Sequence, residues 1–248
     1  MRKLVPFLFV VAALITIVGC SKETPLSSDS SMQSATIEAR TPGRAHASLM
    51  AEYEVVIENL TPNNGNGASQ PFSPPILATH ALTFHIFQEG KYASDELRQV
   101  AEDAVGGPMV TMLSTSPFVN DVAEGSGVIL PGQSASFMIK ARVGFRKLSL
   151  VAMLVNTNDG FVGLDGLRLP VSGSQTYYLD AYDAGTEKNT EMKAHIPGPC
   201  CGNPGVRVPT HEKIDTHDGI EGVGDLDPAV WGWKEPTAKL TITLKSIG

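Results

Sequence analysis

The sequence predicts an all-β fold, a β-sandwich with one short helix. Glycine and proline are frequent, at 24 and 17 of 248 residues, which indicates many turns. The final segment, Ala238–Lys245, alternates apolar and polar residues along its length, as a strand with one buried and one wet face does. Only one segment has a clear helical period. These observations favour two packed sheets.

Each expected strand lies between turn-forming residues. Tyr53–Leu60 is rich in β-branched residues and precedes a cluster of proline, asparagine and glycine at 61–67. Leu148–Val155 is almost continuously apolar, which is typical of a strand covered on both faces. The other expected strands are Leu82–Phe87, Met109–Leu113, Ser134–Arg142, Phe161–Gly163 and Tyr177–Leu179.

The expected helix covers Ser94–Ala104. Ser94 is a suitable N-cap, and Asp95 and Glu96 favour the positive end of the helix dipole. An apolar stripe faces the core, and Gly106 is expected to end the helix. The stripe consists of Leu97, Val100, Ala101 and Ala104.

The composition is that of an ordinary globular protein, with 42% hydrophobic and 18% charged residues and a net charge of -7. No internal repeat or second linker follows residue 50, so we expect one β-sandwich domain at 51–248. No basic run outside the leader could follow a phosphate backbone, which argues against a nucleic-acid partner.

The first 19 residues have the features of a signal peptide. Arg2 and Lys3 precede an apolar stretch, Leu4–Val18, that is short for a membrane span. The segment Ile17–Cys20 resembles a bacterial lipobox, which implies cleavage before Cys20, acylation of that cysteine and attachment to a membrane. By resemblance to the usual sorting pattern, Ser21 favours the outer membrane of the cell envelope. The alternative is an ordinary cleaved signal with a chance cysteine.

Residues 20–50 contain the acylated cysteine and a polar, Ser/Thr-rich segment, which we expect to be a disordered, flexible tether. Beyond it, Cys200 and Cys201 are adjacent in a loop rich in proline and glycine. In an oxidising compartment they form a vicinal disulfide or stay reduced. A loop staple is the simpler interpretation, and a redox role is the alternative.

Two acidic turns, at 157–167 and 182–191, flank a short aromatic strand. They carry Asp159 and Asp165 in the first turn and Asp183 and Glu187 in the second. Clustered carboxylates repel one another unless a cation lies among them, and Ca²⁺ takes about 6–8 oxygen ligands. Asn-Asp-Gly is also a common hairpin turn, so the spacing alone leaves both interpretations open.

Several ordered segments resemble the spondin domain in its bacterial form, over about residues 50–245. The most specific are Asp-x-Phe-Val-Gly at 159–163 and Tyr-Asp-Ala-Gly-Thr-Glu at 182–187. The remaining segments are Tyr53–Asn59, Gln70–Pro75, Ala78–His80, Ala101–Asp103 and Met153–Asn158.

This resemblance implies a C2-like antiparallel β-sandwich that supports adhesion outside the cell, with Ca²⁺ at acidic loops at one end. Asp183 and Glu187 match the second motif, and Asp159 and Asp165 match the acidic positions around Phe-Val-Gly. We therefore expect these four residues to bind structural Ca²⁺. The expected partner is an unidentified protein or glycan. Thrombospondin-type repeats are missing, so receptor-binding roles that depend on them do not transfer.

An enzyme is the less favoured interpretation. The chain has no Gly-x-Ser-x-Gly motif, no phosphate-binding glycine loop and no His-Glu-x-x-His motif. The alternatives to a binding protein are a metal-dependent envelope hydrolase, using the acidic turns or His211 and His217, and a purely structural lipoprotein. His80 and His85 are expected to fill polar niches near the sheet.

Overall fold

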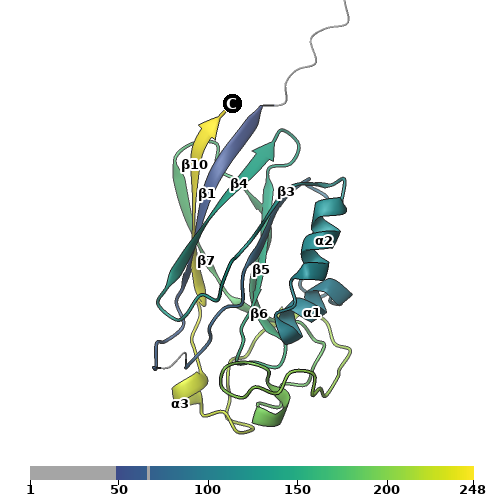
Figure 1. The fold of residues 1–248 in the computed structure, drawn as a ribbon, viewed down its shortest axis with the longest axis vertical. Coiled ribbons are helices and arrows are strands. Elements are labelled where there is room, and N and C mark those ends of the chain that lie inside the picture. The colour runs from purple at the N-terminus through teal and green to yellow at the C-terminus, as the bar shows by residue number, and fades with distance from the viewer. Residues whose placement is uncertain (1–48, 66–67) are drawn as a thin grey trace, which may run out of the picture. The chain divides into compact units, whose positions relative to one another are not determined.

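The computed structural model describes residues 49–65 and 68–248, which form two facing antiparallel sheets (Figure 1). The predicted all-β sandwich is therefore confirmed. The signal peptide, Cys20 and the predicted tether as far as residue 48 lie outside the described residues, and β1 begins one residue before the predicted domain start, at Met50. One sheet has the order β4 (Ser134–Arg142), β1 (Met50–Asn59), β10 (Ala238–Ile247), β7 (Ser174–Leu179). The other has the order β3 (Val119–Glu124), β2 (Ile76–His80), β5 (Lys147–Met153), β6 (Gly160–Arg168), β8 (Ala181–Asp183), β9 (Asp215–Thr216).

The main core lies between the two sheets and follows the predicted alternation. Strand β1 buries Tyr53, Val55 and Ile57, and its central partner β10 buries Leu240 and Ile242. The intervening residues point away from this core. Removing this apolar surface from water is the main force that holds the two sheets together.

A second core lies on the outer face of the β2–β5–β6 sheet, where α1 (Asp95–Asp103) and α2 (Gly107–Thr115) pack (Figure 1). Strand β5 is covered on both faces, as its apolar run predicts: Leu150 faces the main core and Val151 faces the helices. Ser94 caps α1 by accepting a hydrogen bond from the Leu97 N–H at 3.2 Å, which confirms the predicted N-cap.

Two predicted strands are wrong. Met109–Leu113 lies within α2, because Pro108 in the first turn favours a helix and Met109 and Leu113, four residues apart, both face the core. Leu82–Phe87 is a loop, and Leu82 is 70% exposed. The strand is instead the fully buried segment β2 that precedes it.

Helix α1 also ends earlier than predicted. Ala104 takes the left-handed conformation, with φ of 57°, and its N–H bonds back into the last turn. The signal at Gly106 therefore lies two residues beyond the actual cap.

The two ends of the sandwich differ in structure. The start of β1 and the C-terminus lie together at one end, where Met50 and Gly248 exchange backbone hydrogen bonds (Figure 1). The opposite end carries the long loops between β8 and β10, with η1 (Lys193–His195) and α3 (Pro228–Trp231). No helix in the described part of the chain is long and apolar enough to cross a membrane.

Candidate functional site

Asp159 lies fully buried at the loop-rich end of the sandwich, directly before β6. Strand β6 pairs with β8 so that Gly160 is opposite Asp183, which brings the two acidic turns together as predicted. One oxygen of Asp159, Oδ2, accepts hydrogen bonds from the Thr186 and Glu187 N–H groups at 2.7 and 2.9 Å, and from the Thr186 hydroxyl. Its other oxygen, Oδ1, is buried and has no hydrogen-bond partner among the described residues.

Burial, and after it the neighbouring Asp183 carboxylate, raise the pKa of Asp159 to about 7. The backbone N–H groups of Thr186 and Glu187 oppose this shift but do not cancel it. A buried, half-satisfied carboxylate next to a second acid is unfavourable when ionised. Binding of either a proton or a cation would remove the cost of this buried negative charge.

Asp183 is held by its own turn. Its Oδ1 accepts the Gly185 N–H at 2.6 Å, and its Oδ2 accepts from the Asn189 amide. Gly185 has a φ of 70° and lies so close to the next loop that a Cβ there would be 2.6 Å from the Glu212 carbonyl oxygen. Glycine at position 185 is therefore required both by the backbone conformation and by the lack of space.

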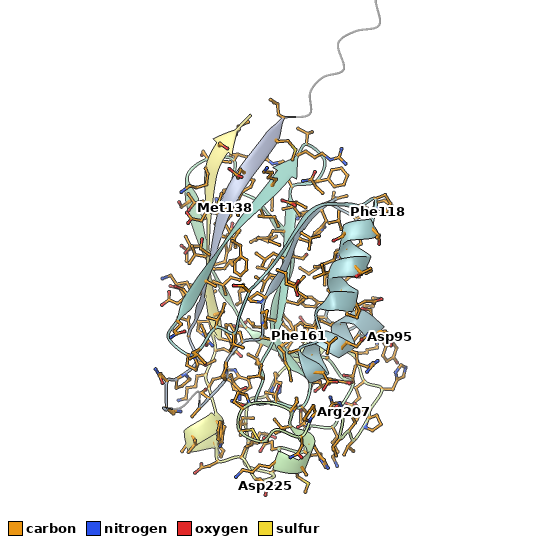
Figure 2. All side chains as sticks on the ribbon, in the orientation of Figure 1. Asp95, Phe118, Met138, Phe161, Arg207 and Asp225 are labelled. Carbon is orange, nitrogen blue, oxygen red and sulfur yellow. A yellow bond between two sulfur atoms is a disulfide. The ribbon has the colours of Figure 1, made fainter. Side chains whose placement is uncertain are left out.

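Glu187 is also buried, but its carboxylate is paired with a cation that the sequence analysis did not identify. The Glu187 carboxylate contacts the Arg207 guanidinium, which also contacts Glu102 and Asp103 at the end of α1. Figure 2 shows Arg207 among the loops beside this helix. Burial raises the pKa of Glu187 to about 8, although Arg207 opposes the shift.

Asp165 lies apart from Asp159 and Asp183, so the four carboxylates do not face a common point as the prediction required. It lies further along β6, where Oδ1 accepts from the Ile86 N–H and the Ser149 hydroxyl, each at 2.8 Å, and Oδ2 contacts His85. A bulge in the β5–β6 pairing turns this part of the strand toward the loop after β2. Across residues 49–65 and 68–248, no three His, Cys, Asp or Glu side chains are grouped to hold a metal ion.

His80, Ser149 and Asp165 form a buried array with the residue types of a catalytic triad but a different order of contacts. The Ser149 hydroxyl lies 2.7 Å from His80 Nε2, while Asp165 contacts the serine rather than the far nitrogen of His80, which bonds to the Ala81 carbonyl. Ser149 is fully buried. The array fills a polar niche, as predicted for His80, whereas His85 contacts Asp165 from an exposed position.

His211 and His217 have different neighbours. His211 stacks on Tyr92 with ring centroids 4.3 Å apart, and His217 packs against Trp233. Nδ1 of His217 accepts the Gly219 N–H, so the neutral ring carries its hydrogen on Nε2. In this arrangement Nε2 is a donor, and it is buried with no hydrogen-bond partner among the described residues.

Two further features fix the long loops at this end. Glu191 is buried and accepts three backbone N–H groups, from Glu221, Gly222 and Val223, at 2.6–2.8 Å. Cys200 and Cys201 are joined by a disulfide. In the sequence, the glycine-containing segment 221–223 is only a weak signal that it binds Glu191. No sequence signal identifies the role of Arg207, because its partners are distant from it in the chain.

We expect Arg207→Met to lower the free energy of unfolding by about 3 kcal/mol, because it leaves the buried Glu187 and Glu102 carboxylates without their shared cation. Arg98→Met is the matched control, since Arg98 pairs with Glu102 from a side chain that is 42% exposed. Its effect should stay within about 1 kcal/mol. Chemical denaturation measures both, and equal effects would contradict the assigned role of Arg207.

In EDTA, the free energy of unfolding should fall as pH rises from about 4 to about 7. In that window the folded state holds a proton on Asp159, whose pKa is about 7, while the unfolded chain, with the ordinary value of 3.8, has lost it. The slope contributed by one such group is up to about 1.4 kcal/mol per pH unit.

Asp159→Asn is the control for this pH dependence, because an amide cannot ionise. Its stability in EDTA should change less with pH than that of the wild type. Parallel stability curves for the two proteins would show that Asp159 does not titrate in this window.

The family comparison agrees with this geometry. The model of the Spondin_N family matches residues 52–198, which is more than half of the chain and includes Asp159, Asp183 and Glu187. A comparison with curated proteins finds no match. The ordered motifs, the sandwich and the family match together show that the chain belongs to the spondin N-terminal domain family.

Proposed function

We propose that this protein is a lipid-anchored adhesion or ligand-binding module of the bacterial outer membrane whose loop-rich end is fixed by Ca²⁺. Family membership points to adhesion or ligand binding outside the cell. The observation that carries the calcium proposal is the buried Asp159 Oδ1, which has no hydrogen-bond partner among the described residues and lies beside a second acid. Cys20 would carry the anchor.

Asp159 and Asp183 are the residues that would hold the cation. An unpartnered carboxylate oxygen is a hard ligand of the kind that Ca²⁺ prefers, and the cation would remove the repulsion between the two acids. Since two carboxylates supply only part of the coordination, water and neutral oxygens would complete it. We expect a dissociation constant of about 10⁻⁴–10⁻³ M, as in extracellular modules.

Glu187 has a supporting role in this proposal. Its carboxylate pairs with Arg207, and its backbone N–H holds Asp159. The family motif position therefore links the cation site to the ion pairs at the end of α1, and its buried Oε2 has no hydrogen-bond partner among the described residues.

The position of the site supports a binding role. The β6–β8 pairing that brings Asp159 and Asp183 together lies at the end of the sandwich opposite the start of β1 (Figure 1). Loops positioned by a rigid scaffold are a common place for recognition.

We also propose that the protein acts by binding rather than by catalysis. The polar side chains that could act in catalysis have structural contacts instead. Ser149 is fully buried, and His217 accepts a hydrogen bond at Nδ1, so its Nε2 is a donor and not a base. Neither gives a nucleophile and a base that a substrate could reach together.

Ca²⁺ should raise the thermal midpoint of the wild type relative to EDTA, because it binds the native state. At a free concentration about 100 times the dissociation constant, the gain is about 2.7 kcal/mol. Asp183→Asn should lose most of this response. Asp165→Asn is the matched control, since Asp165 is bonded elsewhere, and it should keep the full response.

Differential scanning fluorimetry measures these midpoints, with Mg²⁺ as a second control because Mg²⁺ demands a stricter octahedral geometry. No difference between Ca²⁺ and EDTA in the wild type would refute the calcium site. An equal loss in Asp165→Asn and Asp183→Asn would refute its location.

A further inference from the structure

Strand β7 is an edge strand that lacks the usual protection of such edges. It is the last strand of its sheet and pairs only with β10, with no register shift over Ser174–Leu179. The segment contains no charged residue and no proline, and most of its residues are exposed. Charges, prolines and bulges are the features by which edge strands avoid pairing with other chains.

Two other exposed edges of the sandwich are protected. At β4, the Lys140 N–H donates to Asp121 at 2.7 Å, and the Lys140 carbonyl accepts from Asn120 and Thr79. The outer part of β6 has a bulge and carries charges at Asp165 and Arg168. The open edge of β7 is therefore a local feature and not a general property of this fold.

The free backbone groups of β7 can be assigned from its pairing with β10. The Leu244 N–H donates to the Gly173 carbonyl at 3.0 Å, so odd-numbered residues of β7 bond toward β10. Because the direction alternates along a strand, Ser174, Thr176 and Tyr178 direct their N–H and C=O groups away from the sheet. A groove of about 530 Å³ lies beside this edge and is lined in part by Tyr178 and Tyr182.

We propose that β7 pairs antiparallel with β7 of a second copy of this chain, about a two-fold axis at Thr176. Two-fold symmetry requires antiparallel pairing of a strand with itself. In one register the outward-facing N–H and C=O groups of the two strands can bond to each other. This register places Thr176 opposite Thr176 and Ser174 opposite Tyr178. None of the six residues of β7 is charged, so no like charges oppose each other in this register and the edge can pair with itself.

The exposed face of the sheet supports this register. The Ser174 hydroxyl lies 2.8 Å from that of Thr243, and the Thr176 hydroxyl lies 3.4 Å from that of Thr241. Pairing at Thr176 would continue this row of hydroxyl contacts across the two-fold axis. Cross-strand threonine pairs of this kind are favourable.

The geometry also determines how two copies would be oriented. Strand β7 runs parallel to β1, since each is antiparallel to β10. Antiparallel pairing of two β7 strands therefore places the two β1 starts at opposite ends of the dimer. Opposed β1 starts suit two copies on facing surfaces. This inference therefore rests on the proposed adhesion function, and it names a second copy of the chain as the partner.

The test is a charge exchange at Thr176, in the chain from residue 21 to 248 with Ca²⁺ present. The wild type should dimerise reversibly in sedimentation velocity. Thr176→Glu and Thr176→Lys should each weaken the dimer at least about tenfold, because like charges would face each other across the axis. An equimolar mixture of the two should restore it. Thr241→Glu and Thr241→Lys, one strand further in, should dimerise like the wild type.

A second variant does not depend on tolerance of a charge. Thr176→Cys should form a covalent dimer under oxidising conditions, because opposed residues of this pair type lie about 5.5 Å apart, within disulfide reach. Thr241→Cys should not. Monomeric wild type at all concentrations, or a dimer unaffected by the Thr176 variants, would overturn the proposal. If the Ca²⁺ response persists in those samples, only the β7 contact is refuted and the proposed function stands.

Discussion

The buried carboxylate of Asp159 is the constraint on which the loop-rich end of this protein depends. One of its oxygens receives three donors from the Thr186–Glu187 segment and so fixes the second acidic turn to the start of β6. The other oxygen is unsatisfied beside Asp183. The same group thus organises the end of the sandwich and leaves an electrostatic cost there that a cation would remove.

The contacts around this group spread outward from it. The Glu187 N–H holds Asp159 while the Glu187 side chain pairs with Arg207, whose other contacts reach the end of α1. Further along, Glu191 draws the loop at 221–223 back by three backbone hydrogen bonds. The long loops are therefore joined to the start of β6 and to the end of α1. This explains how irregular segments can present a defined surface.

The parts of the fold that follow from local sequence were predictable. Alternation in β10 and the apolar run of β5 gave the sandwich and its doubly covered strand, and Ser94 gave the start of α1. Met109–Leu113 was mistaken for a strand because a five-residue apolar run has no distinguishable period. At the site, motif order identified Asp159 and Asp183, but the pairing of Glu187 with Arg207 and the separation of Asp165 depend on contacts between distant segments.

The most direct test of the calcium claim is the number of protons released when Ca²⁺ binds, measured by titration calorimetry in buffers of different ionisation enthalpy. Since the pKa of Asp159 is about 7, the ion-free protein is mostly protonated there at about pH 6 and ionised at about pH 8.5. We predict release of close to one proton at the lower pH and almost none at the higher. Absence of Ca²⁺ binding, or binding with no proton release at the lower pH, would contradict the claim that the ion replaces a proton at Asp159.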